Sequence, residues 1–278
     1  MSRSDPVRSV GLVGLGQMGR PIARHLLAAG FQLSVHDLDP AAADEARQAG
    51  AAVAGSPAEL ASASQVVLVV VPSDEDVRQV CGGEGGVLRA AAPGVVVVVC
   101  SSVTPETCGE LERSGRRAGI GVVDAALTRG VRHAELGDLT LLVGGDPEDV
   151  ERARPVLEAF SGAIHHLGPV GAGQVGKTVH NLVHWAQIAA ITEALALGQR
   201  LGVPATRLRA ALMDAGVDSR TLRELHLMRF TWWRKDIAYA TAMAEAAGQP
   251  LPLTRLVGRL MEGVTVDRVQ GLLADQGW

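Results

Sequence analysis

The sequence predicts an α/β protein: a doubly wound parallel sheet, followed by an all-α domain that a long helix joins to it. Short apolar runs alternate with helical segments as far as residue 165. Several of these runs, such as residues 66–71, are apolar throughout, as strands in a sheet covered on both faces need to be. After residues 163–166 no convincing strand remains, and residues 175–201 can form one long helix. We therefore expect domains at residues 1–165 and 166–278.

The expected elements follow from apolar patterning and from the positions of glycine and proline. A strand at residues 7–13 ends in glycines, and the helix at residues 17–29 carries Pro21 in its first turn, where a missing N–H costs little. Further strands are expected at residues 31–36, 51–53, 66–71, 95–100, 121–123 and 139–143. The helices between them are expected at residues 40–48, 58–63, 74–80 and 105–117. The helical domain is expected to contain helices at residues 205–213, 222–228, 237–247 and 253–261.

Composition limits the classes of function. The 278 residues are 47% hydrophobic, enough for a large core, and the net charge of −4 gives no sign of a nucleic-acid partner. The longest apolar run, residues 95–100, is far shorter than the roughly 20 residues that cross a bilayer, and residues 1–6 lack the apolar stretch of a signal peptide. The three cysteines show no metal-like spacing and cannot all pair. We expect reduced thiols, a cytoplasmic location and no membrane partner.

A glycine-rich turn follows the first strand and opens the first helix: Gly14-Leu15-Gly16-Gln17-Met18-Gly19. In this G-x-G-x-x-G pattern the first glycine allows a tight turn, the second lets the backbone approach a pyrophosphate, and the third lets helix and strand pack closely. The pyrophosphate charge then lies at the helix N-terminus, where free N–H groups favour it. The sequence therefore predicts a Rossmann-type dinucleotide-binding domain; the alternative is a glycine-rich connector without a ligand.

Asp37 ends the second strand, where an acid bonds the adenosine ribose hydroxyls in dinucleotide-binding domains. A carboxylate there repels a 2′-phosphate, and the next residues, Leu38 and Asp39, offer no arginine to bind one. NAD(H) is therefore expected in preference to NADP(H). The alternative is that Asp37 only caps the next helix, which Asp39 can do equally well.

Residues 171–181, Gly-Ala-Gly-Gln-Val-Gly-Lys-Thr-Val-His-Asn, carry the second informative pattern. Lys177 and Asn181 are four residues apart and share one helix face, about one turn inside the long helix. We expect Lys177 to give a proton to a carbonyl oxygen as hydride arrives, and to remove it in the reverse direction. Asn181 is expected to hold the substrate or the lysine. The alternative is an ordinary exposed helix lysine.

Together these segments resemble the β-hydroxyacid dehydrogenases, a family that includes 3-hydroxyisobutyrate dehydrogenase and tartronate semialdehyde reductase. Residues 14–30 follow the family's GLGxMGxxxAxxLxxxG opening, and residues 171–181 follow its GxGxxxKxxxN signature in full. Residues 124–145 resemble its substrate segment, and Lys235-Asp236 resembles its C-terminal KD pair. The resemblance covers nearly the whole chain. It implies an NAD-dependent dehydrogenase or semialdehyde reductase that forms a homodimer or homotetramer built around the long helix.

The resemblance also implies roles for individual residues. The lysine of residues 171–181 is the catalytic acid/base, and the asparagine one turn later orients the substrate. Lys235 reaches the cofactor side of the cleft. Val71 and Pro72, which close a strand, line the nicotinamide end together with Ser102.

Two departures from the family pattern concern the substrate, and the first is a short segment. The family's Ser-Gly-Gly, whose serine and backbone bind the substrate carboxylate, is here Thr128-Arg129-Gly130. Threonine keeps a hydroxyl, and Arg129 adds paired N–H donors suited to a carboxylate, sulfonate or phosphate. Arg132 and His133 add to a locally basic loop, which is similar to that of a branch acting on sulfolactaldehyde-like aldehydes. We expect Arg129 to bind an anionic group of a small hydroxyacid or aldehyde; the alternative is a solvated loop arginine.

The second departure is residues 216–235, which are several residues shorter than is usual in the family and contain Trp232-Trp233. Substrate size therefore does not carry over, and we expect the tryptophans to fill the helical core.

Two functions compete with the dehydrogenase: an imine reductase, a group that usually lacks the lysine and prefers NADPH, and a dinucleotide-binding protein without catalysis. Lys177 and Asp37 argue against the first, and Lys177 with Asn181 against the second.

Overall fold

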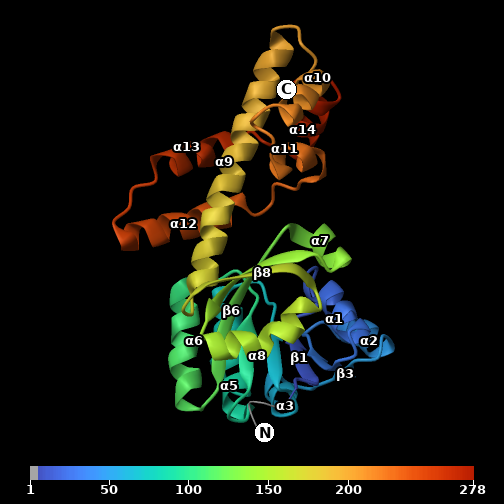
Figure 1. Ribbon diagram of the computed structural model, residues 1–278, viewed down its shortest axis with the longest axis vertical. Helices are drawn as coiled ribbons and strands as arrows, with labels where there is room; N and C mark the ends of the chain where they lie inside the picture. Colours follow the sequence, from blue (N-terminus) through green and yellow to red (C-terminus); the bar gives the residue numbers. More distant parts are fainter. Residues whose placement is uncertain (1–5) are drawn as a thin grey trace. The chain divides into compact units, whose positions relative to one another are not determined.

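The computed structural model describes residues 6–278 (Figure 1). The chain divides into two compact units, Met1–Lys177 and Thr178–Trp278. The first unit thus includes the beginning of the long helix α9 (Ala172–Arg200). The division expected between residues 165 and 166 stays a prediction. Residues 1–5, on which the expected lack of a signal peptide largely rests, lie outside the described residues.

An eight-stranded sheet forms the centre of the first unit. Its strands lie in the order β3-β2-β1-β4-β5-β6-β7-β8, and the neighbouring pairs are parallel except β6 with β7. The Rossmann-type α/β class is confirmed, with the difference that β7 runs antiparallel to β6. The strands are β1 (Ser9–Val13), β2 (Gln32–His36), β3 (Ala52–Val53), β4 (Val66–Val69), β5 (Val96–Val99), β6 (Gly121–Thr128), β7 (Leu139–Gly145) and β8 (Ser161–Gly168).

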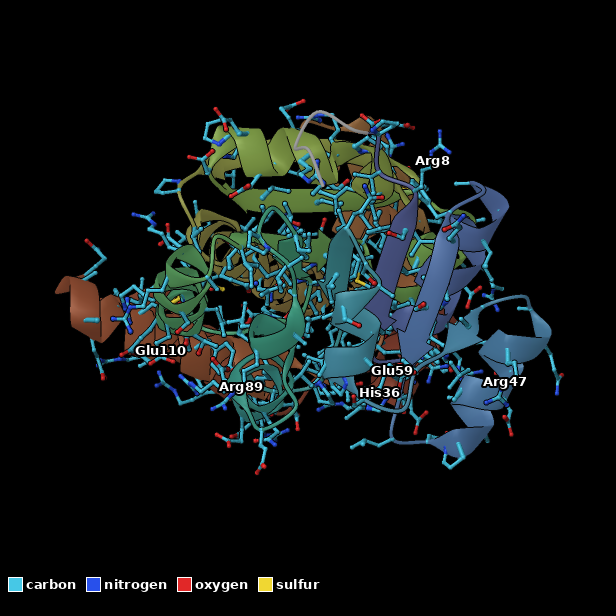
Figure 2. The ribbon with its side chains drawn as sticks, turned by 90° about the horizontal axis from the view of Figure 1, so that it is seen from below. Arg8, His36, Arg47, Glu59, Arg89 and Glu110 are labelled. Carbon is cyan, nitrogen blue, oxygen red and sulfur yellow. The ribbon has the colours of Figure 1, made fainter. Side chains whose placement is uncertain are left out.

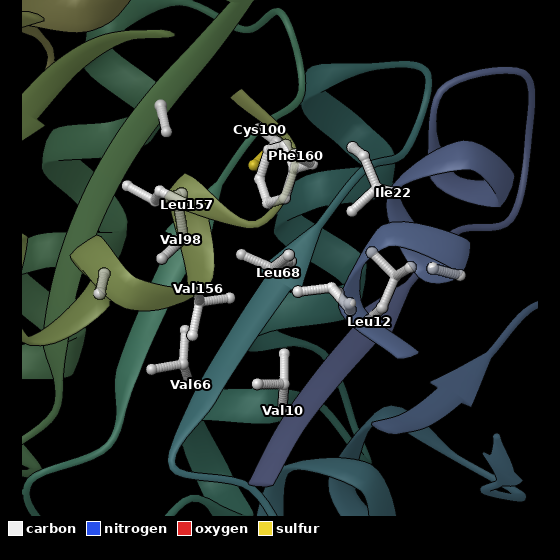
Figure 3. Packing of buried hydrophobic residues seen from close by; sticks show 14 of the residues in the cluster. Val10, Leu12, Ile22, Val66, Leu68, Val98, Cys100, Val156, Leu157 and Phe160 are labelled. Carbon is white, nitrogen blue, oxygen red and sulfur yellow. The ribbon is translucent and has the colours of Figure 1, made fainter. Parts of the chain in front are cut away.

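Helices cover both faces of this sheet. Alternate residues of a strand point to opposite sides, and in the central strands the residues on both sides are apolar and need to be buried. Val66 and Leu68 of β4 pack with Phe160 in one apolar cluster, which Figure 3 shows from close by. Val67 and Val69 of the same strand belong to a second cluster, on the other face. The helices are α1 (Gly19–Ala28), α2 (Pro40–Gln48), α3 (Pro57–Ser62), α4 (Asp74–Gly82), α5 (Val87–Ala90), α6 (Pro105–Arg117), α7 (Gly130–Leu136) and α8 (Pro147–Glu158).

The direction of winding reverses beside β1. The chain passes outward from β1 to β2 and β3, and then returns to β4 on the other side of β1. Open α/β sheets bind ligands at such a point, outside the carboxyl ends of the strands. In Figure 2, Arg8 marks the amino edge of the sheet and His36 its carboxyl edge. The segments that sequence reasoning singled out in this unit begin at that carboxyl edge.

Two expected elements near this edge are corrected. β6 continues to Thr128 instead of ending at residue 123, because Asp124, which interrupts the apolar pattern, is buried with the rest of the strand. The loop expected around Arg132 and His133 is wrong: both residues belong to α7. This helix has only seven residues, and its apolar Val131 and Leu136 are exposed, so the apolar pattern does not follow its buried face.

The second unit is helical throughout its regular elements, as expected. In its core, Trp185 and Ile188 of α9 pack with Leu225 and Trp233. Trp233 was expected there, but its neighbour Trp232 is 64% exposed, so the expectation holds for only one of the two tryptophans. The other elements are α10 (Ala205–Asp214), α11 (Arg220–Glu224), a 3-10 turn (Leu225–Leu227), α12 (Trp233–Ala247), α13 (Pro252–Met261) and α14 (Val266–Leu273).

Several classes of site are not seen in residues 6–278. No helix there is long and apolar enough to cross a membrane. No group of three or more histidine, cysteine or acidic side chains in this range is arranged to hold a metal ion. The three cysteines are free thiols in the core, and burial raises the pKa of Cys81 and of Cys100 to about 12. Such thiols stay protonated at neutral pH and act as small apolar side chains.

Candidate active site

The turn between β1 and α1 requires its glycines for different reasons. Gly14 has a φ of +98°, and a Cβ on it would overlap the carbonyl oxygen of Val70. A Cβ on Gly19 would overlap the carbonyl oxygen of Gly14. A Cβ on Gly16 would meet no described atom within 4 Å, and Gly16 is exposed. The first and third glycines therefore close the turn, whereas the second borders open space that suits a pyrophosphate.

Asp37 folds back onto this turn. Its Oδ2 accepts the N–H of Leu15 at 2.5 Å, and its Oδ1 accepts the N–H of Asp39 at 2.7 Å. The cap of α2 is Asp39, whose side chain accepts the N–H of Ala41 at 3.0 Å. Asp37 therefore holds the glycine turn and leaves the capping to Asp39. Its role toward an adenosine ribose stays a prediction.

Arg20, which sequence reasoning missed, lies beside the same acids. Its Nε donates to the carbonyl oxygen of Leu15 at 2.9 Å. Its Nη1 is 2.9 Å from Oε2 of Glu45, and its Nη2 is 3.9 Å from Oδ2 of Asp39. The signal was present in the sequence, since Arg20 directly follows the last glycine of the turn. This arginine is paired with two carboxylates.

The loops that follow β4 and β5 lie side by side at the carboxyl edge, because the two strands are parallel neighbours. The N–H of Val71 donates to Oγ of Ser101 at 2.8 Å, and that hydroxyl donates to the carbonyl oxygen of Val69 at 3.3 Å. Val71, Pro72 and Ser102 thus belong to two bonded loops. Their contact with a nicotinamide ring stays a prediction.

The first turn of α9 is fixed to β6 by Asp124. Its fully buried carboxylate accepts the N–H of Gly171 at 2.6 Å and the N–H of Gln174 at 2.9 Å. A Cβ on Gly173 would overlap the carbonyl oxygen of Leu142 and crowd Asp124, so this close approach needs a glycine. Sequence reasoning gave Asp124 no role of its own. The available signal was an acid inside an apolar strand, because a buried carboxylate needs hydrogen-bond donors.

Lys177 lies one turn further along α9. Its Nζ donates to the carbonyl oxygen of Leu127 at 2.8 Å, near the carboxyl end of β6, and its side chain is half-buried. Leu127 directly precedes Thr128, so the ammonium group is held beside the expected substrate segment. Lys177 is therefore not an ordinary solvated helix lysine. Its acid/base role stays a prediction.

Asn181 and Lys235 belong to the second unit. Asn181 follows Lys177 by one turn of α9 and is 8% exposed. Lys235 lies in the first turn of α12, with Nζ 5.2 Å from the ring centroid of Tyr239. The next residue, Asp236, accepts the indole N–H of Trp185 at 2.9 Å, which ties α12 to α9. The functional roles of Asn181 and Lys235 stay predictions.

The substrate segment differs from the solvated loop that was the alternative. Oγ1 of buried Thr128 donates to the carbonyl oxygen of Thr140 at 2.8 Å. Arg129 has a φ of +78°, which is uncommon for a residue other than glycine. Its Nη1 lies 2.6 Å from Oδ2 of Asp138 and donates to that residue's carbonyl oxygen at 2.9 Å. Gly130, at the start of α7, is exposed. Arg129 is therefore a paired arginine, and substrate binding by this segment stays a prediction.

Asp124 also predicts how stability depends on pH. Burial raises the pKa of its carboxyl group to about 6, although the N–H groups of Gly171 and Gln174 oppose the rise. A carboxyl group in the unfolded chain titrates near 3.9, so the folded protein binds the proton more tightly. The stability that Asp124 contributes is thus present below about pH 4 and is lost as the pH rises through about 6.

We therefore expect the unfolding free energy without cofactor to fall by up to about 3 kcal/mol over this range because of Asp124. Asp124→Asn does not titrate, so the difference between wild type and variant should shrink as the pH rises from 4 to 6. Urea denaturation at several pH values measures both proteins. Parallel stability curves would contradict the assignment.

Two family models match consecutive parts of the chain. The NAD binding domain of 6-phosphogluconate dehydrogenase matches residues 9–168. The NAD-binding domain of NADP-dependent 3-hydroxyisobutyrate dehydrogenase matches residues 171–275.

Individual relatives are similar over most of their length. The NAD-dependent L-serine dehydrogenase of Pseudomonas aeruginosa is 37% identical over 199 residues, 72% of this chain and 67% of that protein. The 2-(hydroxymethyl)glutarate dehydrogenase of Eubacterium barkeri is 31% identical over 265 residues, 91% of this chain and 88% of that protein. The structure of Mycobacterium tuberculosis 3-hydroxyisobutyrate dehydrogenase with L-serine has a TM-score of 0.82 at 29% identity, and the match covers 98% of this chain and 95% of that one.

A Rossmann-type domain followed by a helical unit, with a lysine held at the carboxyl edge of the sheet, defines a nicotinamide-dependent oxidoreductase. The chain belongs to the β-hydroxyacid dehydrogenase family, the family of 3-hydroxyisobutyrate dehydrogenase. An imine reductase from Myxococcus stipitatus matches with a TM-score of 0.68 at only 20% identity, which shows a shared fold and nothing more. The family assignment made from the sequence is confirmed, and the imine reductase is a distant neighbour.

Proposed function

We propose that this dehydrogenase uses NAD(H) to interconvert a small anionic β-hydroxyacid and its semialdehyde or aldehyde, with Lys177 as the general acid/base. The observation that carries the proposal is the bond from Nζ of Lys177 to the carbonyl oxygen of Leu127. It holds a proton-carrying group at the end of β6, next to the segment that replaces the family's carboxylate-binding Ser-Gly-Gly. The glycine turn begins at the same edge of the sheet.

The chain's own residues supply binding and proton transfer. Bound NAD(H) supplies the hydride chemistry, and the open space beside Gly16 fits its pyrophosphate. As the alcohol is oxidised, Nζ of Lys177 takes the hydroxyl proton; in the reduction it returns a proton to the carbonyl oxygen. The carbonyl oxygen of Leu127 accepts a hydrogen bond from this amine and holds it at the end of β6. Asn181, one turn later on α9, orients the substrate.

The preference for NAD(H) over NADP(H) rests on the charges around Asp37. Three carboxylates lie between the end of β2 and the end of α2: those of Asp37, Asp39 and Glu45. Asp37 bonds the glycine turn directly, and the other two lie beside Arg20, the residue after that turn. They repel a 2′-phosphate, and Arg20, the cation near them, is already paired with two of them. The similar proteins differ in their cofactor. The L-serine dehydrogenase is named NAD-dependent, whereas the family model that matches residues 171–275 is described by an NADP-dependent enzyme.

A substrate screen tests the function. The purified protein is assayed with C3–C5 β-hydroxyacids and their sulfonate analogues, each with NAD⁺ and with NADP⁺, by the absorbance of the reduced cofactor. We expect turnover of at least one anionic hydroxyacid with NAD⁺ and much slower turnover with NADP⁺. Turnover only with NADP⁺ would refute the cofactor preference, and no turnover of any hydroxyacid with either cofactor would refute the reaction.

The anionic character of the substrate is proposed from Arg129. Its side chain is 20% exposed, and its Nε is buried without a hydrogen-bond partner in the described part of the chain. An unsatisfied buried donor costs about 1–3 kcal/mol, so the position facing Asp138 is an imperfect one for this guanidinium. We propose that the guanidinium exchanges the carboxylate of Asp138 for a substrate carboxylate or sulfonate, which would also give its Nε an acceptor. We propose that Thr128 and Gly130, on either side of Arg129, contact the same anionic group.

Removing this guanidinium should weaken substrate binding. A hydrogen bond to a charged group contributes about 1.5–3 kcal/mol, so Arg129→Ala should raise KM for the acid substrate about 10-fold to 100-fold. Steady-state kinetics at fixed NAD⁺ measures the change. Arg132→Ala is the matched control, because Arg132 is an exposed arginine on the adjacent α7. An unchanged KM for Arg129→Ala, or an equal rise in both variants, would contradict the role.

The proposed homodimer or homotetramer is supported by apolar side chains on the surface of α9. Val175, Val179 and Val183 are spaced four residues apart and are all exposed. Leu197 and Leu201 continue as exposed residues near the other end of the helix. A second copy of the chain would bury this face.

A further inference from the structure

Gln174 makes two side-chain bonds to the loop that follows β5. It lies in the first turn of α9, is 2% exposed, and precedes Lys177 by about one turn. Its Nε2 donates to the carbonyl oxygen of Ser101 at 2.9 Å. Its Oε1 accepts the N–H of Val103 at 3.3 Å. The two bonds flank Ser102, so the amide of Gln174 holds the backbone on both sides of that residue.

The backbone of Gln174 is fixed as well. Its N–H donates to Oδ2 of Asp124, the buried acid that attaches α9 to β6. The same strand accepts the hydrogen bond of Nζ of Lys177 at Leu127. Gln174 thus joins three parts of the first unit: the loop carrying Ser102, the strand β6, and the helical turn that leads to the lysine.

We propose that Gln174 is a positioning residue that fixes the loop of Ser102 relative to Lys177. The proposal rests on the proposed function, in which Ser102 lies at the nicotinamide end and Lys177 serves the substrate oxygen. Hydride and proton are exchanged at adjacent atoms, the carbon and the oxygen of one carbonyl group. The nicotinamide end and the lysine must therefore keep a fixed separation, and a small error in it costs rate more than binding.

Gln174→Met tests the proposal, because methionine has a similar length and makes neither hydrogen bond. We expect kcat to fall about 10-fold to 100-fold while KM for NAD⁺ and for the hydroxyacid stays close to that of the wild type. The assay uses NAD⁺ and the hydroxyacid that turns over best in the C3–C5 screen. Deuterium on the carbon that bears the hydroxyl should slow kcat more in the variant, because hydride transfer becomes the slower step.

Gln65→Met is the matched control. Gln65 is 4% exposed, and its Oε1 accepts the N–H groups of Arg8 and Ser9 at 2.7 and 3.1 Å, but it lies at the amino edge of the sheet. The two variants lose comparable backbone bonds, so a merely structural role predicts equal effects. We expect Gln65→Met to lower stability and leave kcat and the isotope effect unchanged.

Wild-type kcat in Gln174→Met, or the same loss of kcat in both variants, would overturn the proposal. If Gln174→Met does not fold, Gln174→Asn decides, because its amide is one methylene shorter and does not reach Ser101 and Val103 together. A lower kcat with unchanged KM then supports the role, and wild-type kcat refutes it.

Lys177→Ala separates a failure of the Gln174 role from a failure of the proposed function on which it rests. If that variant is active, the proposed function fails; if it is inactive while Gln174→Met keeps its rate, only this inference fails.

Discussion

Lys177→Ala should lower kcat by at least about 100-fold, the lower end of what a general acid–base group contributes. The variant loses the amine that the carbonyl oxygen of Leu127 holds at the end of β6. Binding of NADH should persist, since the glycine turn and Asp37 form a separate group of contacts within the first unit. Steady-state turnover with the best hydroxyacid of the screen, together with fluorescence titration of NADH, measures both quantities.

Lys177→Arg separates charge from proton transfer. Arginine keeps the positive charge and can still donate to the carbonyl oxygen of Leu127, but it does not release a proton near neutral pH. We expect it to be nearly as slow as the alanine variant. A Lys177→Ala protein that keeps wild-type kcat would refute the acid/base role, and a fast Lys177→Arg protein would show that the charge alone suffices.

Gly16→Ala and Gly19→Ala should fail in different ways, although both lie in the same turn. A Cβ on Gly19 overlaps the carbonyl oxygen of Gly14, so this variant should lose about 1–3 kcal/mol of stability without any cofactor. A Cβ on Gly16 meets no described atom within 4 Å, so the second variant should be as stable as the wild type. Its methyl group would stand where the backbone approaches a pyrophosphate, and NADH affinity should fall about 10-fold to 100-fold.

Chemical denaturation without cofactor and NADH titration distinguish these outcomes. The two variants serve as controls for each other, because each adds one methyl group to a glycine of one turn. If Gly16→Ala binds NADH as tightly as the wild type, the pyrophosphate does not lie against that residue. If Gly19→Ala is as stable as the wild type, the turn is looser than the overlap with Gly14 indicates.

Local patterns in the sequence predicted the fold class and the main candidate site. Runs such as residues 66–71 are apolar throughout because both of their faces are buried, and this holds whatever the details of packing. The glycine turn was visible because Gly14 and Gly19 answer local steric demands, and Gly16 completes the spacing of the pattern. Composition offers one more signal: of the 26 lysines and arginines only two are lysines, Lys177 and Lys235. Lysine changes protonation far more readily than arginine, which suits a residue that transfers protons.

Only the tertiary structure decided which atoms these residues contact. Arg129 pairs with Asp138, Lys177 with the carbonyl of Leu127, and Asp37 with the N–H of Leu15. These partners are 9 to 50 residues apart in the sequence, and in two of the three pairs one partner is a backbone group that carries no residue-specific signal. Asp124 and Gln174 stayed hidden for the same reason, because what they bind is the backbone of loops and of a helix start. Periodicity reports which face of an element is buried; hydrogen bonds between distant segments depend on the packed arrangement of the strands and helices.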